Sequence, residues 1–270
     1  MGNSEARRFS VTAFMCVFNE ADILPFTLRH LIDQGVDVHV IDNWSTDGSD
    51  QIDQRFPLAG FERFPAEGDG GMYRWRALLQ RVEVLASASD ASWCVHHDAD
   101  EIRRSPRSNE SLLDAFERMD RDGYDAADHQ VFCFRPTDEL YAGDPERHFR
   151  HYSDDGVDNR LRHIKAWKNV GRVSLARSGG HEAAFAGRRV CPEKLILKHY
   201  PIRSSQQGAR KVLTERVPRF DPAERAMRWH VQYDELARTK EWVCDPAMLR
   251  EWNLQMNDSN RPITRRKGLL

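Results

Sequence analysis

The chain has 270 residues, which is enough for one α/β domain with an appended helical piece. Because its 40 basic and 42 acidic side chains nearly cancel, the charge favours neither a nucleic-acid partner nor a membrane surface. Five scattered cysteines, and the lack of a secretory signal or a membrane-spanning apolar run, predict a cytoplasmic protein without a disulfide framework or structural zinc.

The first residues of the sequence predict a βαβ unit. Residues 11–20 (VTAFMCVFNE) form a short apolar run that ends in a polar turn, as a buried parallel strand does. Residues 21–35 carry apolar side chains at helical spacing and end in a glycine, which is typical of a helix. Residues 36–41 then form a second strand, and the crossover between the two strands should be right-handed.

The same alternation continues to about residue 125. A third possible strand near 61–68 precedes an amphipathic helix within 68–88 and a central strand at 92–97. Another amphipathic helix follows within 108–125, with Ser108 or Asn109 as its expected cap. The alternation predicts an α/β fold with an open, mostly parallel central sheet that helices flank on both faces.

After residue 126 the regular alternation of strand and helix patterns ends. Residues 126–136 and 172–201 indicate strands with irregular connections, and a helical region begins at residue 204. We expect the main domain to span 1–215 and a C-terminal helical extension, ending in a polar tail, to span 216–270.

Polar clusters follow three of the predicted strands, beginning at Asn19, Asp42 and Asp98. Ligands of doubly wound sheets bind outside the carboxyl ends of the strands, so these clusters mark a candidate site. Asp98 and Asp100 are one residue apart and can reach a single Mg²⁺ or Mn²⁺, with the remaining positions left for water and substrate phosphates. The alternative is a solvated acidic loop after the strand.

Two stretches of the sequence resemble family 2 glycosyltransferases. Residues 17–49 (VFNEADILPFTLRHLIDQGVDVHVIDNWSTDGS) resemble the family's opening, and residues 93–101 (WCVHHDADE) resemble its DxD element. The DADE form, together with residues 197–212 (LKHYPIRSSQQGARKV), is similar to a bacterial branch that shares an Asp-x-Asp-Glu motif. The likeness covers roughly residues 10–215.

This resemblance implies a GT-A (Rossmann-like) fold and a transferase that moves a sugar from a nucleotide-sugar donor, most commonly a UDP-sugar, to an acceptor hydroxyl with inversion. It also implies a Mn²⁺ or Mg²⁺ cofactor. The residues that match family positions are Asn19, Glu20, Asp42 and Asp98 for the donor nucleotide and Asp98, Asp100 and His199 for the metal. Asn43 and Trp44 depart from the family pattern, which has a second Asp and a Gly there.

Residue types indicate candidates for two further roles, the cation that neutralises the leaving group and the catalytic base. Arg162 or Lys165 could neutralise the leaving diphosphate, since cationic side chains match phosphate oxygens; an exposed basic edge strand is the alternative. Glu182, in a glycine-flanked loop, is the expected catalytic base, and its neighbour His181 could orient the acceptor or approach the metal. The rival bases are Glu101, Asp138 and Glu139.

Two other functions fit parts of the pattern. A sugar-phosphate nucleotidylyltransferase shares the sheet architecture, but the turn after the first strand lacks the basic, glycine-rich loop expected of it. A non-catalytic nucleotide-sugar-binding relative would keep the fold without turnover. The acceptor stays open between a glycan, a lipid-linked molecule, a small molecule and a peptide.

Overall fold

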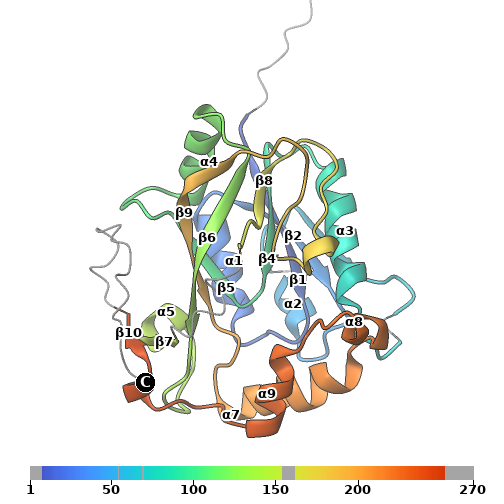
Figure 1. The fold of residues 1–270 in the computed structure, drawn as a ribbon, viewed down its shortest axis with the longest axis vertical. Helices are drawn as coiled ribbons and strands as arrows, with labels where there is room; N and C mark the ends of the chain where they lie inside the picture. Colours follow the sequence, from blue (N-terminus) through green and yellow to red (C-terminus); the bar gives the residue numbers. More distant parts are fainter. Residues whose placement is uncertain (1–7, 54, 69, 154–161, 253–270) are drawn as a thin grey trace, which may run out of the picture.

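The computed structural model describes residues 8–53, 55–68, 70–153 and 162–252 (Figure 1). One ten-stranded sheet runs through the molecule, and its parallel part has the order β4, β1, β2, β3. These strands are β1 (Val11–Val17), β2 (Asp37–Asp42), β3 (Gly60–Arg63) and β4 (Trp93–Asp98). In the register, Val17 lies opposite Asp42 and Cys16 opposite Asp98, so the polar residues that follow these strands gather at one edge of the sheet.

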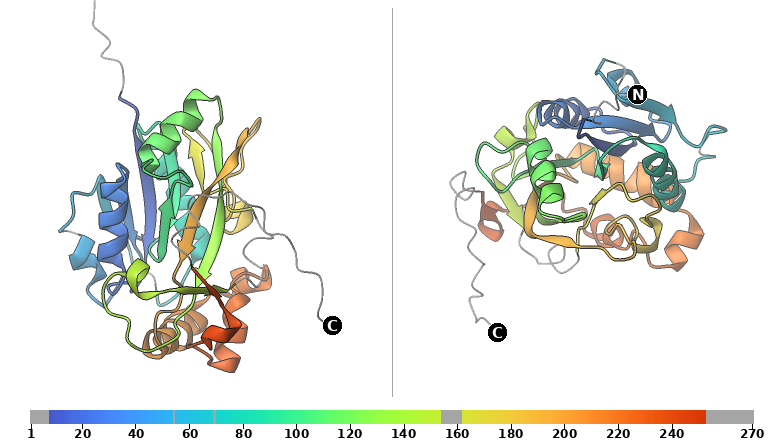
Figure 2. Two further views of the ribbon diagram at one scale, coloured as in Figure 1. Left: turned by 90° about the vertical axis from the view of Figure 1, so that its left-hand side faces the viewer. Right: turned by 90° about the horizontal axis from the view of Figure 1, so that it is seen from above.

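Helices cover both faces of this parallel part (Figure 2). Alternate residues of β1 pack on one face with α1 (Leu24–Asp33) and α4 (Leu112–Arg121). The opposite face packs against α3 (Trp75–Ala88), which contributes buried leucine, valine and alanine side chains. The short helix α2 (Ser49–Asp53) follows β2. Burial on both faces explains why β1 and β4 read as nearly continuous apolar runs.

The second half of the sheet is mixed. β8 runs antiparallel between β4 and β6, whereas β9 runs parallel to β6 and antiparallel to β5. The bounds are β5 (Glu101–Arg104), β6 (Ala126–Phe134), β7 (His151–Ser153), β8 (Ala166–Lys168), β9 (Val190–His199) and β10 (Arg250–Glu251). Because β1, β2, β3, β4, β6 and β9 share one direction, the sheet is mostly parallel, which confirms the predicted α/β class.

The C-terminal helices lie below the carboxyl ends of the parallel strands in Figure 1. They are α7 (Ser205–Ala209), the π-helix η2 (Arg210–Arg216), the 3₁₀ turn η3 (Val217–Arg219), α8 (Pro222–Ala226) and α9 (Gln232–Thr239), followed by the 3₁₀ turn η4 (Pro246–Met248). Glu224 of α8 accepts hydrogen bonds from the backbone N–H groups of Trp75 and Arg76, at 3.2 and 2.6 Å. A residue from the end of the chain therefore caps α3, which has no side-chain cap of its own.

The cap of α4 differs from the expectation. Ser111, not Ser108 or Asn109, is the N-cap, because its hydroxyl accepts from the N–H of Asp114 while the Asp114 carboxylate accepts from Ser111. This reciprocal pair satisfies two free N–H groups at once. Asn109 instead adopts a left-handed φ of 61° in the preceding turn.

Within the described ranges, none of the helices is both long and apolar enough to cross a bilayer.

An ion-pair cluster on α5 (Pro145–His148) predicts an acid-dependent stability. Glu146 bonds Arg104 and lies 2.7 Å from Lys198. Burial opposes ionisation of Glu146, but these two cations outweigh it and lower its pKa to about 2, from 4.5. The folded pKa lies below the unfolded one, so the stabilisation is complete above pH 4.5 and is lost as the pH falls towards 2.

We therefore expect Glu146→Gln to lower the unfolding free energy by roughly 2–3 kcal/mol at pH 7 and to flatten its decline between pH 4.5 and 2. Urea unfolding across this pH range measures both effects. The exposed Glu117 of α4 provides a matched control, and Glu117→Gln should leave the curve unchanged. An acid limb that is identical in Glu146→Gln and the wild type would contradict the assignment.

Candidate functional site

A cavity of about 400 Å³ opens at the carboxyl ends of β1 and β4. Its walls come from the strand ends, the start of α3, the loop 178–181 and the C-terminal helices. The charged and histidine side chains that line it are Glu20, His96, Asp98, Asp100, Lys165, His181, His199, Lys211, Arg216, Arg228 and His230. The cavity thus combines carboxylates with a larger number of basic groups.

The turn between β4 and β5 fixes the two aspartates of the DxD element. Asp98 ends β4, and Asp100 lies in the turn, where its carbonyl accepts from the N–H of Tyr200 at 2.9 Å. The carbonyl of Ala99 accepts from the hydroxyl of Thr27 at 2.7 Å. Pairing of β5 with β9 then brings His199 alongside this turn. A side-chain donor and a backbone donor from other parts of the chain therefore bond the carbonyls of this turn and hold both aspartates at the cavity.

Asp98 belongs to a buried charged chain. Its Oδ2 lies 2.6 Å from Nζ of Lys165, and the same ammonium lies 2.7 Å from Glu101. Glu101 also contacts Arg103 at 2.7 Å. Burial opposes the charge of Lys165, but the carboxylates of Asp98 and Glu101 outweigh it and raise its pKa. Lys165 is 4% exposed and remains a cation in the wall of the cavity.

Asp100 faces both a lysine and a histidine. Its Oδ2 lies 2.8 Å from Nζ of Lys211, and its Oδ1 lies 3.5 Å from Nε2 of His199. Burial opposes ionisation of Asp100, but Lys211 and His199 outweigh it and hold its pKa well below the usual range. Burial likewise opposes the charge of His199, and the facing Asp100 overcomes this and raises its pKa.

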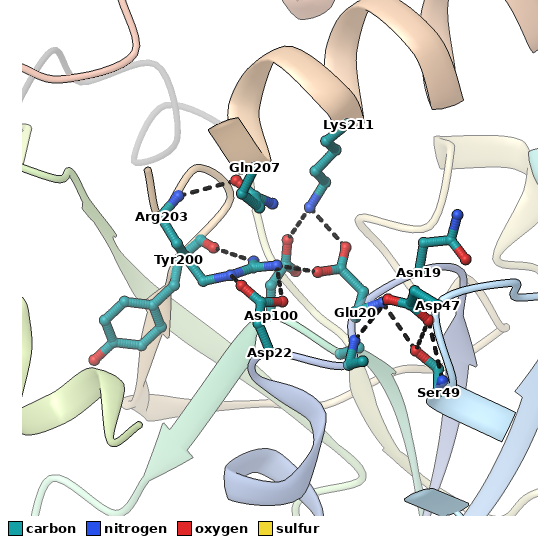
Figure 3. Close-up of polar contacts among 12 residues, drawn as sticks. Asn19, Glu20, Asp22, Asp47, Ser49, Asp100, Tyr200, Arg203, Gln207 and Lys211 are labelled. Carbon is teal, nitrogen blue, oxygen red and sulfur yellow. Dashed lines mark hydrogen bonds and ion pairs between the residues drawn. The ribbon is translucent and has the colours of Figure 1, made fainter. Parts of the chain in front are cut away.

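A second network ties the turn after β1 to the C-terminal segment (Figure 3). The carboxylate of Glu20 lies 2.5 Å from Arg203 and 2.7 Å from Lys211. Arg203 also bonds both oxygens of Asp22, each at 2.7 Å, and the carbonyl of Tyr200 at 2.9 Å. Lys211 thus bridges Glu20 and Asp100, which follow different strands.

The donor set at this turn fits a hard cation only in part. In the described ranges, no group of three or more histidine, cysteine, aspartate or glutamate side chains is arranged to hold a metal ion. Asp100 and His199 offer two facing donors, and sites for Mg²⁺ or Mn²⁺ are commonly completed by substrate phosphates and water. These residues therefore suit a metal that binds together with a diphosphate, and its binding would displace the proton of His199.

Of the predicted donor residues, Glu20, Asp98 and Lys165 line the cavity, whereas Asn19 and Asp42 do not appear in its lining. Asn19 accepts from the N–H of Thr46 at 2.8 Å and donates to Glu215 at 2.7 Å. Asp42 is fully buried and accepts from the N–H of Ser45 at 3.2 Å. Both side chains organise the turn after β2. Arg162 is exposed and lies outside the described lining.

The structure places Glu182 beside the cavity, and its carboxylate bonds Arg188. Ser178, Gly179, Gly180 and His181 from the same loop line the cavity, whereas Glu182 is absent from its described lining. The two histidines before Asp98 have different surroundings. His96 lines the cavity and contacts the carbonyl of Gly180 at 3.1 Å, and His97 contacts the carbonyl of Asp98 at 2.7 Å.

Several cavity residues were not predicted from the sequence. Tyr73 and Trp75 form an aromatic wall with stacked rings 6.0 Å apart, and residues 228–233 close the cavity from the C-terminal side. Lys211, and Arg203 which holds Glu20 from outside the described lining, fall within the stretch that carries the family resemblance, which was the available signal. Arg216 and residues 228–233 reach the cavity through packing of distant helices, for which the sequence carries no local signal.

Neither a protein-family model nor a curated protein matches this sequence. Among solved structures, the fold is similar to mannosyl-3-phosphoglycerate synthase from Rubrobacter xylanophilus, with 15% sequence identity and a TM-score of 0.34. The match covers 50% of this chain and 43% of that protein, which is less than half of its length. A likeness this distant says nothing about activity. The function is therefore inferred from the residues of the cavity.

Proposed function

We propose that the protein is a metal-dependent glycosyltransferase that moves a sugar from a nucleotide-sugar donor, a UDP-sugar in the first instance, to an acceptor hydroxyl with inversion. One observation carries the proposal. Asp98, Asp100 and His199, which match the family's metal and diphosphate positions, line one cavity with Glu20 of the turn after β1. This convergence supports the motif matches, because residues far apart in the sequence meet where a doubly wound sheet binds its ligands.

Sugar transfer requires stabilisation of charge on the departing diphosphate. Asp98, Asp100 and His199 would hold a Mn²⁺ or Mg²⁺ ion, which when bound would act as a Lewis acid on that group. Lys165 would add a fixed positive charge, because its ammonium is already oriented by Asp98 and Glu101. A cation that is held in place before the reaction needs no reorganisation during it.

The donor nucleotide would meet the turns after β1 and β2. Glu20 faces the cavity directly, whereas Asn19 and Asp42 would act through the shape of the turn whose N–H groups they bind. The proposed base is Glu182, and reaching an acceptor in the cavity would require its carboxylate to leave Arg188. Arg162, which is exposed and lies three residues before Lys165, remains a proposed diphosphate contact.

A thermal-shift experiment tests this function. Purified protein is measured with UDP alone, with Mn²⁺ alone and with both, and then with UDP-, GDP- and dTDP-sugars. Because the described residues assemble no group of three or more metal-ligating side chains, Mn²⁺ should stabilise the protein strongly only when the diphosphate is present. At about a hundredfold excess over the dissociation constant, the combination should raise the melting temperature by about 5–10 °C.

The accompanying assay is release of nucleoside diphosphate. We expect release to require both a metal and an acceptor. A protein that shows no metal-dependent shift and no release with any of these donors would refute the proposal. A metal-dependent shift without release across a panel of sugar, lipid-linked and peptide acceptors would favour the non-catalytic binding relative instead.

A further inference from the structure

Arg216, at the end of η2, is a buried cation that forms no ion pair with any carboxylate of the described residues. It is 7% exposed and lines the cavity. Its Nε and Nη1 atoms find no hydrogen-bond partner among the described residues, and no described carboxylate forms an ion pair with it. The neighbouring buried cations differ, because Lys165, Lys211 and Arg203 each contact at least one carboxylate within 2.8 Å.

Aromatic rings hold the guanidinium of Arg216 in place. Its Cζ lies 4.1 Å from the ring centre of Tyr73 and 5.2 Å from that of Phe18. Ring faces attract a cation but offer no acceptor for its N–H groups. The guanidinium is therefore oriented, while its Nε and Nη1 donors stay without a partner, and buried donors without partners are costly.

The π-helical form of η2 places this charge next to another. In an α-helix, residues five apart point about 140° away from each other. The i to i+5 pattern of a π-helix brings Lys211 and Arg216 towards one face, and both line the cavity. π-Helical turns are often found at functional sites, and here the turn supplies two cations to one space.

We propose that Arg216 is an anion-binding residue of this cavity and that its ligand group is a phosphate or a carboxylate. The forked guanidinium matches the oxygens of either group, and such a ligand would supply the missing counter-charge. Assigning the group to the donor's diphosphate or to an acidic acceptor rests on the proposed function. Anion binding itself does not rest on it.

Titration calorimetry with inorganic pyrophosphate, in buffer without divalent metal, tests the proposal. The wild type should bind, and Arg216→Met should raise the dissociation constant at least tenfold. Arg219→Met is the matched control, because Arg219 packs 4.1 Å from the ring of Phe18 but is absent from the described lining; its affinity should stay within twofold of the wild type.

The melting temperature of the ligand-free variant separates ligand binding from a purely structural role. Since Arg216→Met removes a charge that forms no ion pair with a described carboxylate, the ligand-free variant should melt close to the wild-type temperature. Wild-type protein that does not bind pyrophosphate would overturn the proposal, as would a variant that melts lower and keeps wild-type affinity. If the methionine variant does not fold, Arg216→Gln repeats the test with the same tenfold criterion.

Two further titrations identify the source of the anion. Weaker UDP binding by Arg216→Met would assign the contact to the donor diphosphate. Unchanged UDP binding, with loss of inorganic phosphate binding to the UDP-saturated protein, would assign it to an acidic acceptor. Because these measurements use neither a nucleotide sugar nor turnover, failure of the glycosyltransferase proposal would leave a positive pyrophosphate result standing.

Discussion

Replacing Asp100 with asparagine is expected to lower the rate of sugar transfer by about 10²–10³-fold, because it removes the charge that would help to hold the metal and the diphosphate. The fold should survive, since Lys211 keeps its 2.7 Å contact with Glu20. The rate is measured as nucleoside diphosphate release at saturating Mn²⁺, and circular dichroism checks the fold.

Asp37 provides the matched control for this variant. It begins β2, is exposed and lies outside the described cavity lining, so Asp37→Asn should transfer sugar at the wild-type rate. An Asp100→Asn protein with an unaffected rate would remove Asp100 from the metal site. A lowered rate in both variants would point to a general loss of charge instead.

Replacing Arg203 with methionine is expected to destabilise the protein by about 3–5 kcal/mol. Arg203 is fully buried and holds Glu20 and Asp22, so its loss leaves the buried Glu20 and the more exposed Asp22 with less counter-charge. For a chain of this length, the loss should lower the melting temperature by roughly 10 °C or more. Thermal unfolding and urea unfolding measure the effect independently.

The exposed Arg147 supplies a control of the same residue type. It pairs with Asp144 on the surface with 89% of its side chain exposed, so Arg147→Met should change stability by less than about 0.5 kcal/mol. If Arg203→Met were as stable as Arg147→Met, the network of Figure 3 would contribute nothing to folding.

Periodicity predicted the first half of the fold because local and tertiary requirements agree there. β1 and β4 are buried on both faces, so their sequences are nearly continuous apolar runs, and α1 and α3 carry one apolar face each. The antiparallel placement of β8 was not predictable, because a strand of three residues has no measurable period. Its position depends on pairing with β4 and β6, which are distant in sequence.

Some residues of the cavity could likewise be predicted from the sequence, and others could not. Asp98, Asp100 and Glu20 were predictable because each follows a strand whose carboxyl end faces the ligand edge. His199 was identified through the family motif. Arg216 was not, because the C-terminal helices dock through contacts such as Glu224 with the start of α3, which only the folded chain brings together.

The bridging position of Lys211 also has a consequence for biogenesis. The carboxylates of Glu20 and Asp100 emerge from the ribosome more than a hundred residues before the lysine that neutralises them. An N-terminal segment that folds during synthesis would therefore carry mutually repelling carboxylates at its open edge. The cavity becomes electrostatically complete only when residues 203–216 dock, which makes its formation a late step in folding.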